Sequence, residues 1–166
     1  MDRLSPEQDL LGTRNDLCVR LARSEREVAT AQKLRFSVFY EELKASPDTA
    51  ASHSRRDADR FDAFCDHLIV VRRTAGNEAG KFGVDDGEMV GTYRLLRQSV
   101  AEQNGGFYTQ SEFDIAPLLA AKPALKFLEL GRSCVLKQYR TKPVVELLWQ
   151  GIWNYVRHHG MAVMLG

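Results

Sequence analysis

The sequence has 166 residues, of which 44% are hydrophobic and 27% charged, as expected of a single soluble domain with a sizeable core. Its 23 Lys and Arg residues nearly balance its 22 Asp and Glu residues, so the overall charge gives no reason to expect a nucleic-acid partner. The longest uninterrupted apolar runs are far shorter than a bilayer-spanning helix, which leaves only peripheral membrane contact open.

The three cysteines are far apart and form no CxxC pair, which fits a reducing compartment better than a disulfide framework. We therefore expect a cytoplasmic protein, with peripheral contact at the inner membrane left open. No His and Cys residues stand together at ligand spacing, so no metal site is expected. Cys134 is expected to be a small buried thiol rather than a nucleophile.

Residues 1–16 are mixed in charge and lack the apolar run of a signal peptide, so they are predicted to form a loose tail. One domain is expected over 17–166. It begins with a strand at 17–21, where apolar residues occupy every second position.

Ser24 and Glu27 match a capping box and predict a helix that begins there and ends near Leu43. Arg35 projects from the middle of the apolar stripe of this helix. A functional role would explain that position, and so would a stem that covers apolar surface while its head reaches water. The polar run after Pro47 predicts a loop and a candidate lid.

The runs 67–73 and 89–97 predict two strands joined by a long, Gly-rich and acidic loop. After an irregular stretch with one short helical turn, the stretch 128–140 predicts the next strand. A helix is expected from Pro143 to Gly160, followed by a strand that begins at Met161. The helix residues expected in the core are Val145, Leu148, Ile152 and Tyr155 or Val156. Trp149 and Trp153 are also expected in the core, with the lining of an acyl tunnel as the alternative.

This order of elements predicts an α/β fold with a mixed, largely antiparallel sheet, flanked by helices and containing at least one parallel crossover. The sequence stops directly after the last predicted strand. We therefore expect a domain that is truncated at its C-terminus.

Glu129 and Arg132 lie in a strand that otherwise reads as buried, and in a regular strand they would point to opposite faces. Gly131 between them permits a β-bulge, which would bring both side chains onto one face and leave backbone N–H groups unpaired. The alternative is that each pairs with another strand or lies at an edge. Arg140, Thr141 and Lys142 follow at a helix start, where N–H groups and the helix dipole attract an anion.

The sequence contains four motifs in a fixed order: RFSVF at 35–39, DRFD at 59–62, VGTYRLL at 90–96, and LELGRSCV at 128–135 followed by YR. As a set, these motifs resemble the GNAT-related N-acyltransferases that make ornithine lipids. They resemble the acyl-homoserine lactone synthases more distantly.

The resemblance implies a GNAT-like fold and transfer of a 3-hydroxyacyl group from acyl carrier protein to the α-amine of ornithine, forming lyso-ornithine lipid. The donor would be the acyl-phosphopantetheine of the carrier protein, with no bound cofactor. A lactone synthase-like acyltransferase is one alternative. An inactive, truncated fragment that only binds the carrier protein is another.

The resemblance also implies a set of site residues. Phe107 matches an aromatic residue that lines the acyl or donor pocket. The matching charged positions are Arg35, Asp59, Asp62, Arg94, Glu129 and Arg132. In the related fold the kinked strand and the following helix start hold the pantetheine arm and its phosphate, which here points to Gly131, Ser133, Arg140, Thr141 and Lys142.

Acylation of an amine needs a neutral nucleophile, a proton acceptor and donors for the thioester oxygen. Glu129 is the candidate base, with a water relay as the alternative, and the backbone from Gly131 to Ser133 would donate to the oxygen. Asp59 and Asp62 would hold the two ammonium groups of ornithine, unless they only form a turn or a helix cap. Cations around the entrance would attract an acidic carrier protein, namely Arg55, Arg56, Arg60, Arg140 and Lys142.

Overall fold

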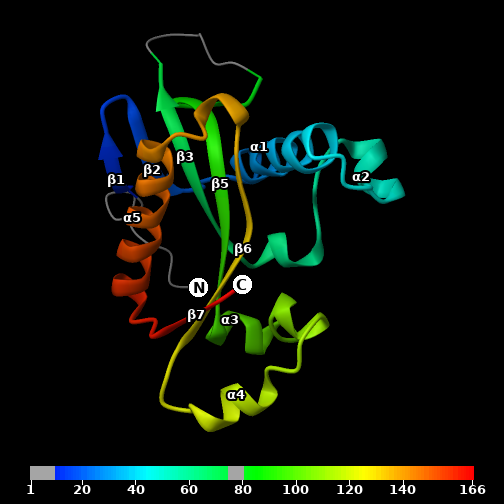
Figure 1. Ribbon diagram of the computed structural model, residues 1–166, viewed down its shortest axis with the longest axis vertical. Coiled ribbons are helices and arrows are strands. Elements are labelled where there is room, and N and C mark those ends of the chain that lie inside the picture. Colours follow the sequence, from blue (N-terminus) through cyan, green and yellow to red (C-terminus); the bar gives the residue numbers. More distant parts are fainter. Residues whose placement is uncertain (1–9, 75–80) are drawn as a thin grey trace.

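A computed structural model describes residues 10–74 and 81–166 of the protein (Figure 1). Seven strands of these residues form one sheet in the order β1-β2-β3-β5-β6-β7, with the short β4 paired to β5. The strands are β1 Leu10–Arg14, β2 Leu17–Leu21, β3 Asp66–Arg73, β4 Gly83–Val84, β5 Gly87–Arg97, β6 Phe127–Val135 and β7 Val163–Leu165. The helices are α1 Glu25–Phe36, α2 Thr49–Ser54, α3 Gln98–Gln103, α4 Ala116–Ala121 and α5 Lys142–His159.

All strand pairs are antiparallel except β6 and β7, which are parallel and connected through α5. The predicted α/β layout with a largely antiparallel sheet and a parallel crossover is therefore confirmed. In Figure 1, α1 and α5 cover opposite faces of the sheet, and each helix buries its own apolar cluster against it. A third cluster fills a smaller lobe formed by α3 and α4 beyond the end of β5.

The predicted loose tail over 1–16 is wrong from Leu10 onward, because residues 10–14 form β1 and pair with β2. Leu11 is buried in the core, and its carbonyl accepts a hydrogen bond from Asn154 of α5 at 2.7 Å. Tertiary packing therefore orders a strand of only five residues. The first nine residues of the predicted tail lie outside the described residues.

The helix α1 begins as predicted, with the Ser24 hydroxyl accepting the backbone N–H of Glu27. The Glu27 carboxylate does not complete the capping box. It accepts instead the backbone N–H of Arg23 at 2.7 Å and binds the buried guanidinium of Arg20 at 2.6 Å. After Phe36 the chain continues as a π-helix, η1 Ser37–Glu42, which brings the helical segment to the predicted end.

The polar stretch predicted as a loop contains the short helix α2. Asp48 caps this helix, because its side chain accepts the backbone N–H of Ala51 at 2.7 Å. A single 3₁₀ turn, η2 Arg60–Ala63, then leads into β3. None of the helices in the described part of the chain has the length and apolar character needed to cross a bilayer.

The helix α5 has its predicted start and its predicted stop at Gly160, which adopts φ 61°. Three of its residues contradict the core prediction, because Trp149 is 51%, Trp153 is 58% and Val145 is 45% exposed. The cause is Gly151, where a Cβ atom would lie 2.7 Å from a Val19 methyl group, so that this side of the helix must face the sheet. The buried residues are Val144, Leu147, Leu148, Gly151, Ile152, Tyr155 and Val156.

Candidate active site

The strand β6 is distorted at the position predicted. On β5 one residue separates Thr92 from Arg94, whereas on β6 two residues, Arg132 and Ser133, separate their partners, which defines a β-bulge. The left-handed residue of the bulge is Arg132, with φ 53°, rather than Gly131. Such a conformation costs a non-glycine residue about 1–3 kcal/mol and persists only where surrounding contacts hold it.

Glu129 is buried on β6, just before the bulge. Its carboxylate accepts the backbone N–H of Tyr108 at 3.0 Å and that of Thr109 at 2.6 Å. The hydroxyl of Thr109 donates a third hydrogen bond at 2.6 Å. Glu129 therefore fixes the 3₁₀ turn η3 Tyr108–Ser111 against β6.

Glu129 and Arg132 approach the same residue without pairing with each other. The Arg132 guanidinium lies over the Tyr108 ring at 5.2 Å from its centroid, while Glu129 binds the backbone of that residue. Arg132 forms its ion pairs with Asp57 at 3.2 Å and Asp59 at 3.4 Å. The bulge thus directs the arginine toward a neighbouring group of acids.

Arg35 lies at the centre of this group and is only 1% exposed. Its guanidinium donates to the Asp57 side chain at 2.8 Å, to the Asp57 carbonyl at 2.5 Å and to Asp62 at 2.8 Å. One nitrogen, Nη1, has no hydrogen-bond partner among the described residues. The alternative in which the Arg35 head reaches water is therefore wrong.

Asp59 and Asp62 cap the turn η2 and also bind arginines. The Asp59 side chain accepts the N–H of Phe61 at 2.9 Å, and the Asp62 side chain accepts the N–H of Asp59 at 3.1 Å. Arg94 of β5 donates to Asp59 at 2.6 Å and to Asp62 at 3.2 Å. The capping alternative is thus correct for the backbone, while the remaining lone pairs serve ion pairs.

We refer to Arg35, Asp57, Asp59, Asp62, Arg94 and Arg132 as the charge network. Three guanidinium groups balance three carboxylates, so the buried charges are compensated. Burial alone would raise the pKa of Asp62, but the charge and hydrogen bonds of Arg35 outweigh it and lower that pKa to about 2. Asp62 is therefore an anion at neutral pH.

Sequence reasoning missed Asp57, Gln32, Tyr40 and His67. Asp57 joins Arg35 to Arg132 and also accepts the Tyr40 hydroxyl at 3.1 Å. Gln32 donates to Asp62 at 2.9 Å. His67 contacts the Asp62 carbonyl at 3.1 Å, and burial lowers its pKa.

The only sequence signal for Asp57 was its place two residues before Asp59. For Gln32 and Tyr40 the signal was their position on the helix that carries Arg35. Neither pattern singles out a site on its own, because the partners come from other elements.

Asp59 and Arg132 form the accessible edge of the charge network. Their side chains are 26% and 29% exposed, whereas the other four members are nearly closed to solvent. A ligand that reaches the network would therefore meet this acid and this guanidinium first. They offer one negative and one positive group side by side.

The residues predicted to hold the donor are spread over the bulge and the start of α5. Ser133 is exposed in the bulge, and Thr141 is the N-cap residue of α5 without a capping hydrogen bond from its side chain. Arg140 makes a bidentate contact to Glu42 of η1, at 2.6 and 2.8 Å. Lys142 is exposed and lies 3.6 Å from Glu146.

The other cations of the predicted entrance patch also have partners. Arg55 pairs with Glu41, Arg56 donates to Gln32 at 2.9 Å, and Arg60 lies over the Phe61 ring at 4.6 Å. Carrier-protein docking would therefore have to compete with existing contacts at these positions.

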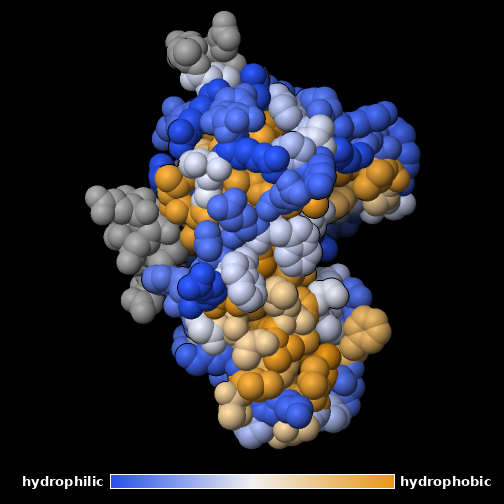
Figure 2. All heavy atoms as spheres, turned by 60° about the vertical axis from the view of Figure 1, so that its left-hand side comes forward, coloured by the Kyte–Doolittle hydropathy of each residue, from blue (hydrophilic) through white to orange (hydrophobic). Residues whose placement is uncertain are grey.

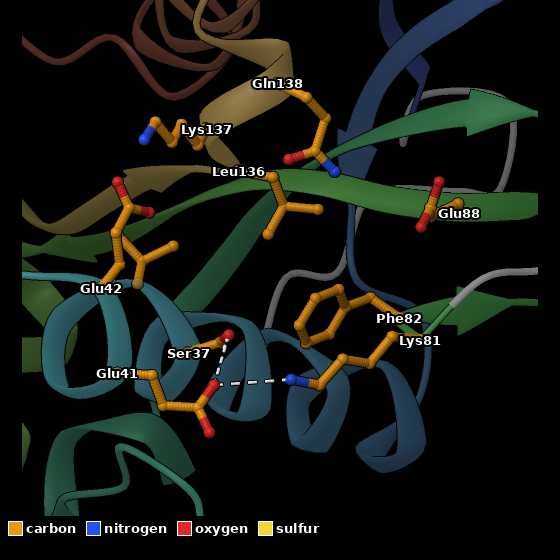
Figure 3. Close-up of a pocket in the computed structure, with 10 residues that line it drawn as sticks. Ser37, Glu41, Glu42, Lys81, Phe82, Glu88, Leu136, Lys137 and Gln138 are labelled. Carbon is orange, nitrogen blue, oxygen red and sulfur yellow. Dashed lines mark hydrogen bonds and ion pairs between the residues drawn. The ribbon is translucent and has the colours of Figure 1, made fainter.

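A cavity of about 390 Å³ opens between η1, the residues around β4 and the segment after β6 (Figure 3). Glu41 and Glu42 reach it from η1, and the Glu41 carboxylate is held by Ser37 and Lys81. A second cavity, of about 600 Å³, lies between the end of β5, the segment before β6 and the end of α5. Neither cavity is lined by Glu129 or Arg132.

Two further predicted residues are buried away from both cavities. Phe107 packs in the apolar cluster of the α3–α4 lobe, together with Phe61 and Phe127. Cys134 is buried on β6, and burial raises the pKa of its thiol to about 12, which keeps it protonated at neutral pH.

Comparisons with known proteins give relatives along most of the chain. The L-ornithine N(alpha)-acyltransferase of Rhizobium meliloti (strain 1021) is 50% identical over 162 residues, covering 98% of this chain and 53% of the relative. The protein of the same name from Agrobacterium fabrum (strain C58 / ATCC 33970) is 49% identical over 159 residues, covering 96% and 52%. The chain thus spans about half the length of these curated relatives.

Solved structures match the fold at low identity. FeeM, an N-acyl amino acid synthase from uncultured soil microbes, aligns with TM-score 0.58 and 12% identity, over 89% of this chain and 70% of FeeM. The AHL synthase LasI aligns with TM-score 0.55 and 16% identity, over the same shares. A family model described as an acetyltransferase (GNAT) domain matches residues 34–150. The chain therefore belongs to the GNAT acetyltransferase domain family.

Proposed function

We propose that the protein is an N-acyltransferase that acylates the α-amine of ornithine. The observation that carries this proposal is the 50% identity, along 98% of this chain, to a protein named L-ornithine N(alpha)-acyltransferase. The charged positions that suggested the reaction support it, because five of them, Arg35, Asp59, Asp62, Arg94 and Arg132, belong to one network beside the bulge.

The proposed donor is a 3-hydroxyacyl group on the phosphopantetheine arm of acyl carrier protein, and no other cofactor is required. The product would be lyso-ornithine lipid. Nucleotide-bound donors in this fold usually rely on a glycine-rich turn between strand and helix. Residues 139–143 at this place read YRTKP and contain no glycine, which favours a carrier protein over coenzyme A as the donor. Lys142, exposed at the start of α5, would contribute to docking of the acidic carrier protein.

The accessible edge of the charge network fits the amino acid end of ornithine. Asp59 would bind an ammonium group and Arg132 the carboxylate. Asp62 is a poorer ligand than predicted, because Arg35, Arg94, Gln32 and a backbone N–H already occupy its oxygens.

The bulge at Arg132 and Ser133 would supply backbone donors to the thioester oxygen as charge develops on it. Both oxygens of Glu129 already accept hydrogen bonds. A water relay therefore fits the geometry better than direct proton transfer to Glu129. In this mechanism Glu129 positions Tyr108 and Thr109 beside the reacting groups.

The direct test is release of free thiol from purified 3-hydroxyacyl carrier protein by this chain. We expect release that depends on ornithine and a weaker reaction with the corresponding coenzyme A thioester. Release that is equal with and without ornithine would refute the acceptor assignment. Formation of an acyl-homoserine lactone instead would favour the lactone synthase-like alternative.

A fragment that binds the carrier protein without catalysis remains a second candidate, because the chain spans about half the length of its curated relatives. It predicts a stable complex with acyl carrier protein and no turnover. Running the binding and thiol-release measurements on the same preparation separates the two functions. We further propose a cytoplasmic location with peripheral contact at the inner membrane.

A further inference from the structure

The helix α5 exposes both tryptophans of the sequence on its outer side. Trp149 and Trp153 lie one turn apart, and the exposed Val145 lies one turn before them. We call these three residues the tryptophan face. At 3.6 residues per turn, Trp149, Trp153 and Lys142 lie within about 40° of one another around the helix axis. Exposure of two large aromatic side chains on one ordered helix needs an explanation.

The orientation of the tryptophan face is fixed by the packing of α5. Gly151, on the opposite side of the helix, leaves no space for a Cβ atom against Val19. Asn154 donates to the carbonyl of Leu11 on β1. The helix therefore cannot rotate to bury its tryptophans without losing these contacts.

The charges of α5 are arranged around the tryptophan face with a positive balance. Lys142 begins the helix and Arg157 lies in its last turn, so cations flank the face at both ends. The single carboxylate of the helix, Glu146, is paired with Arg14 at 2.5 Å and lies 3.6 Å from Lys142. Glu146 compensates only part of the charge of Lys142, Arg14 and Arg157, so the surface around the tryptophans combines apolar rings with a net positive charge.

We propose that the tryptophan face docks on the surface of an anionic phospholipid bilayer. Indole rings favour the headgroup region, because they have an apolar body and a polar N–H. Cations beside an apolar helix face add attraction to anionic lipids. The helix lies on the outside of the sheet in Figure 1, and Figure 2 turns that side of the molecule forward.

This docking deepens the proposed function and in part rests on it, since the proposed product has a single acyl chain and would leave toward a bilayer. The exposure and charge pattern of α5 do not depend on the reaction. Binding to phospholipid vesicles can be measured without substrate or carrier protein, so a failure to bind vesicles and a failure of the acyltransferase assignment are distinguishable.

Intrinsic tryptophan fluorescence reports the environment of the tryptophan face directly, because the sequence contains no tryptophans besides Trp149 and Trp153. Vesicles of phosphatidylcholine mixed with phosphatidylglycerol should shift the emission to shorter wavelength. Brominated phosphatidylcholine in the same vesicles should quench it. Vesicles of phosphatidylcholine alone, or high salt, should reduce both effects. Trp149→Phe and Trp153→Phe each leave one reporter, and both variants should still bind.

Cosedimentation of the protein with the same vesicles supplies the matched comparison. The double variant W149A/W153A should bind about tenfold more weakly or worse, because the rings supply most of the inserted apolar area. Phe113→Ala, which removes another exposed aromatic residue on the α3–α4 side, should bind like the wild type. Arg157→Gln should weaken binding to anionic vesicles more than to neutral ones.

The proposal is overturned if neither vesicle changes the emission, or if W149A/W153A sediments with anionic vesicles as well as the wild type. A blue shift that grows with protein concentration in the absence of lipid, together with a dimer in analytical ultracentrifugation, would also overturn it. That result would assign the tryptophan face to contact between two copies of the chain.

Discussion

Asp62 connects three elements of the fold through its side chain. It receives hydrogen bonds from Gln32 and Arg35 of α1, from Arg94 of β5 and from the backbone of the turn η2. Removing one partner from a buried set of ion pairs leaves uncompensated charge, which costs more than the pair itself contributes. The stability of the site therefore depends strongly on single residues.

We expect Asp62→Ala to lower the free energy of unfolding by about 3–5 kcal/mol, because Arg35 and Arg94 would lose their shared carboxylate while remaining buried. Urea denaturation measures the change. Asp85→Asn, at an exposed carboxylate of the turn between β4 and β5, serves as control and should cost less than about 0.5 kcal/mol. A loss of under 1 kcal/mol for Asp62→Ala would mean that the network contributes little to stability.

The lowered pKa of Asp62 should also make the free energy of unfolding depend on pH. Its pKa falls from 3.8 to about 2 on folding, so its contribution to stability is complete above pH 3.8 and is lost as pH decreases through about 2. That shift corresponds to about 2 kcal/mol. Unfolding measured across this range should be less pH-dependent in Asp62→Asn than in the wild type. Identical pH profiles would contradict the assignment.

The left-handed conformation of Arg132 can be tested with two substitutions that both remove its guanidinium. Arg132→Gly should be more stable than Arg132→Ala by about 1 kcal/mol, because only alanine places a Cβ atom in that region. At Arg72 of β3, which is not left-handed, the order should reverse. Thermal unfolding measures both pairs. If the glycine variant were the more stable, or the less stable, of the pair at both positions, the result would contradict the left-handed conformation of Arg132.

At the scale of elements, the segments with strong local signals were predictable. Alternation in β2, the cap at Ser24 and the glycine stop at Gly160 act within a few residues, so the sequence alone reveals them. The strand β1 was missed because it is short and becomes ordered through β2 and α5. The exposure of Trp149 and Trp153 was missed because hydrophobicity does not reveal which side of α5 approaches the sheet.

Gly151 tests the explanation for the orientation of α5. Gly151→Ala would gain helix propensity, but its Cβ atom would lie 2.7 Å from Val19, so we expect a net loss of about 1–3 kcal/mol. Gln150→Ala, at an exposed neighbour, should change stability little. Differential scanning calorimetry measures both. A stabilised Gly151→Ala variant would show that α5 does not approach β2 as closely as described.

At the scale of the whole molecule, the sheet brings together residues that are far apart in the sequence. Arg35, Asp59, Arg94 and Arg132 come from four elements and meet beside one bulge. The motif resemblance could suggest these positions, but it could not reveal that Asp57 connects them. It also could not separate the accessible Asp59 from the saturated Asp62, because burial depends on the packed elements together.

The measurement that tests the central claim most directly is mass spectrometry of lipid extracts from cells that express this sequence. The account predicts a new hydroxyacyl amide of ornithine that is absent from cells with an empty vector. Extracts without any such species, despite folded protein and available ornithine, would contradict the account, and an acyl-homoserine lactone in the medium would point to the alternative reaction.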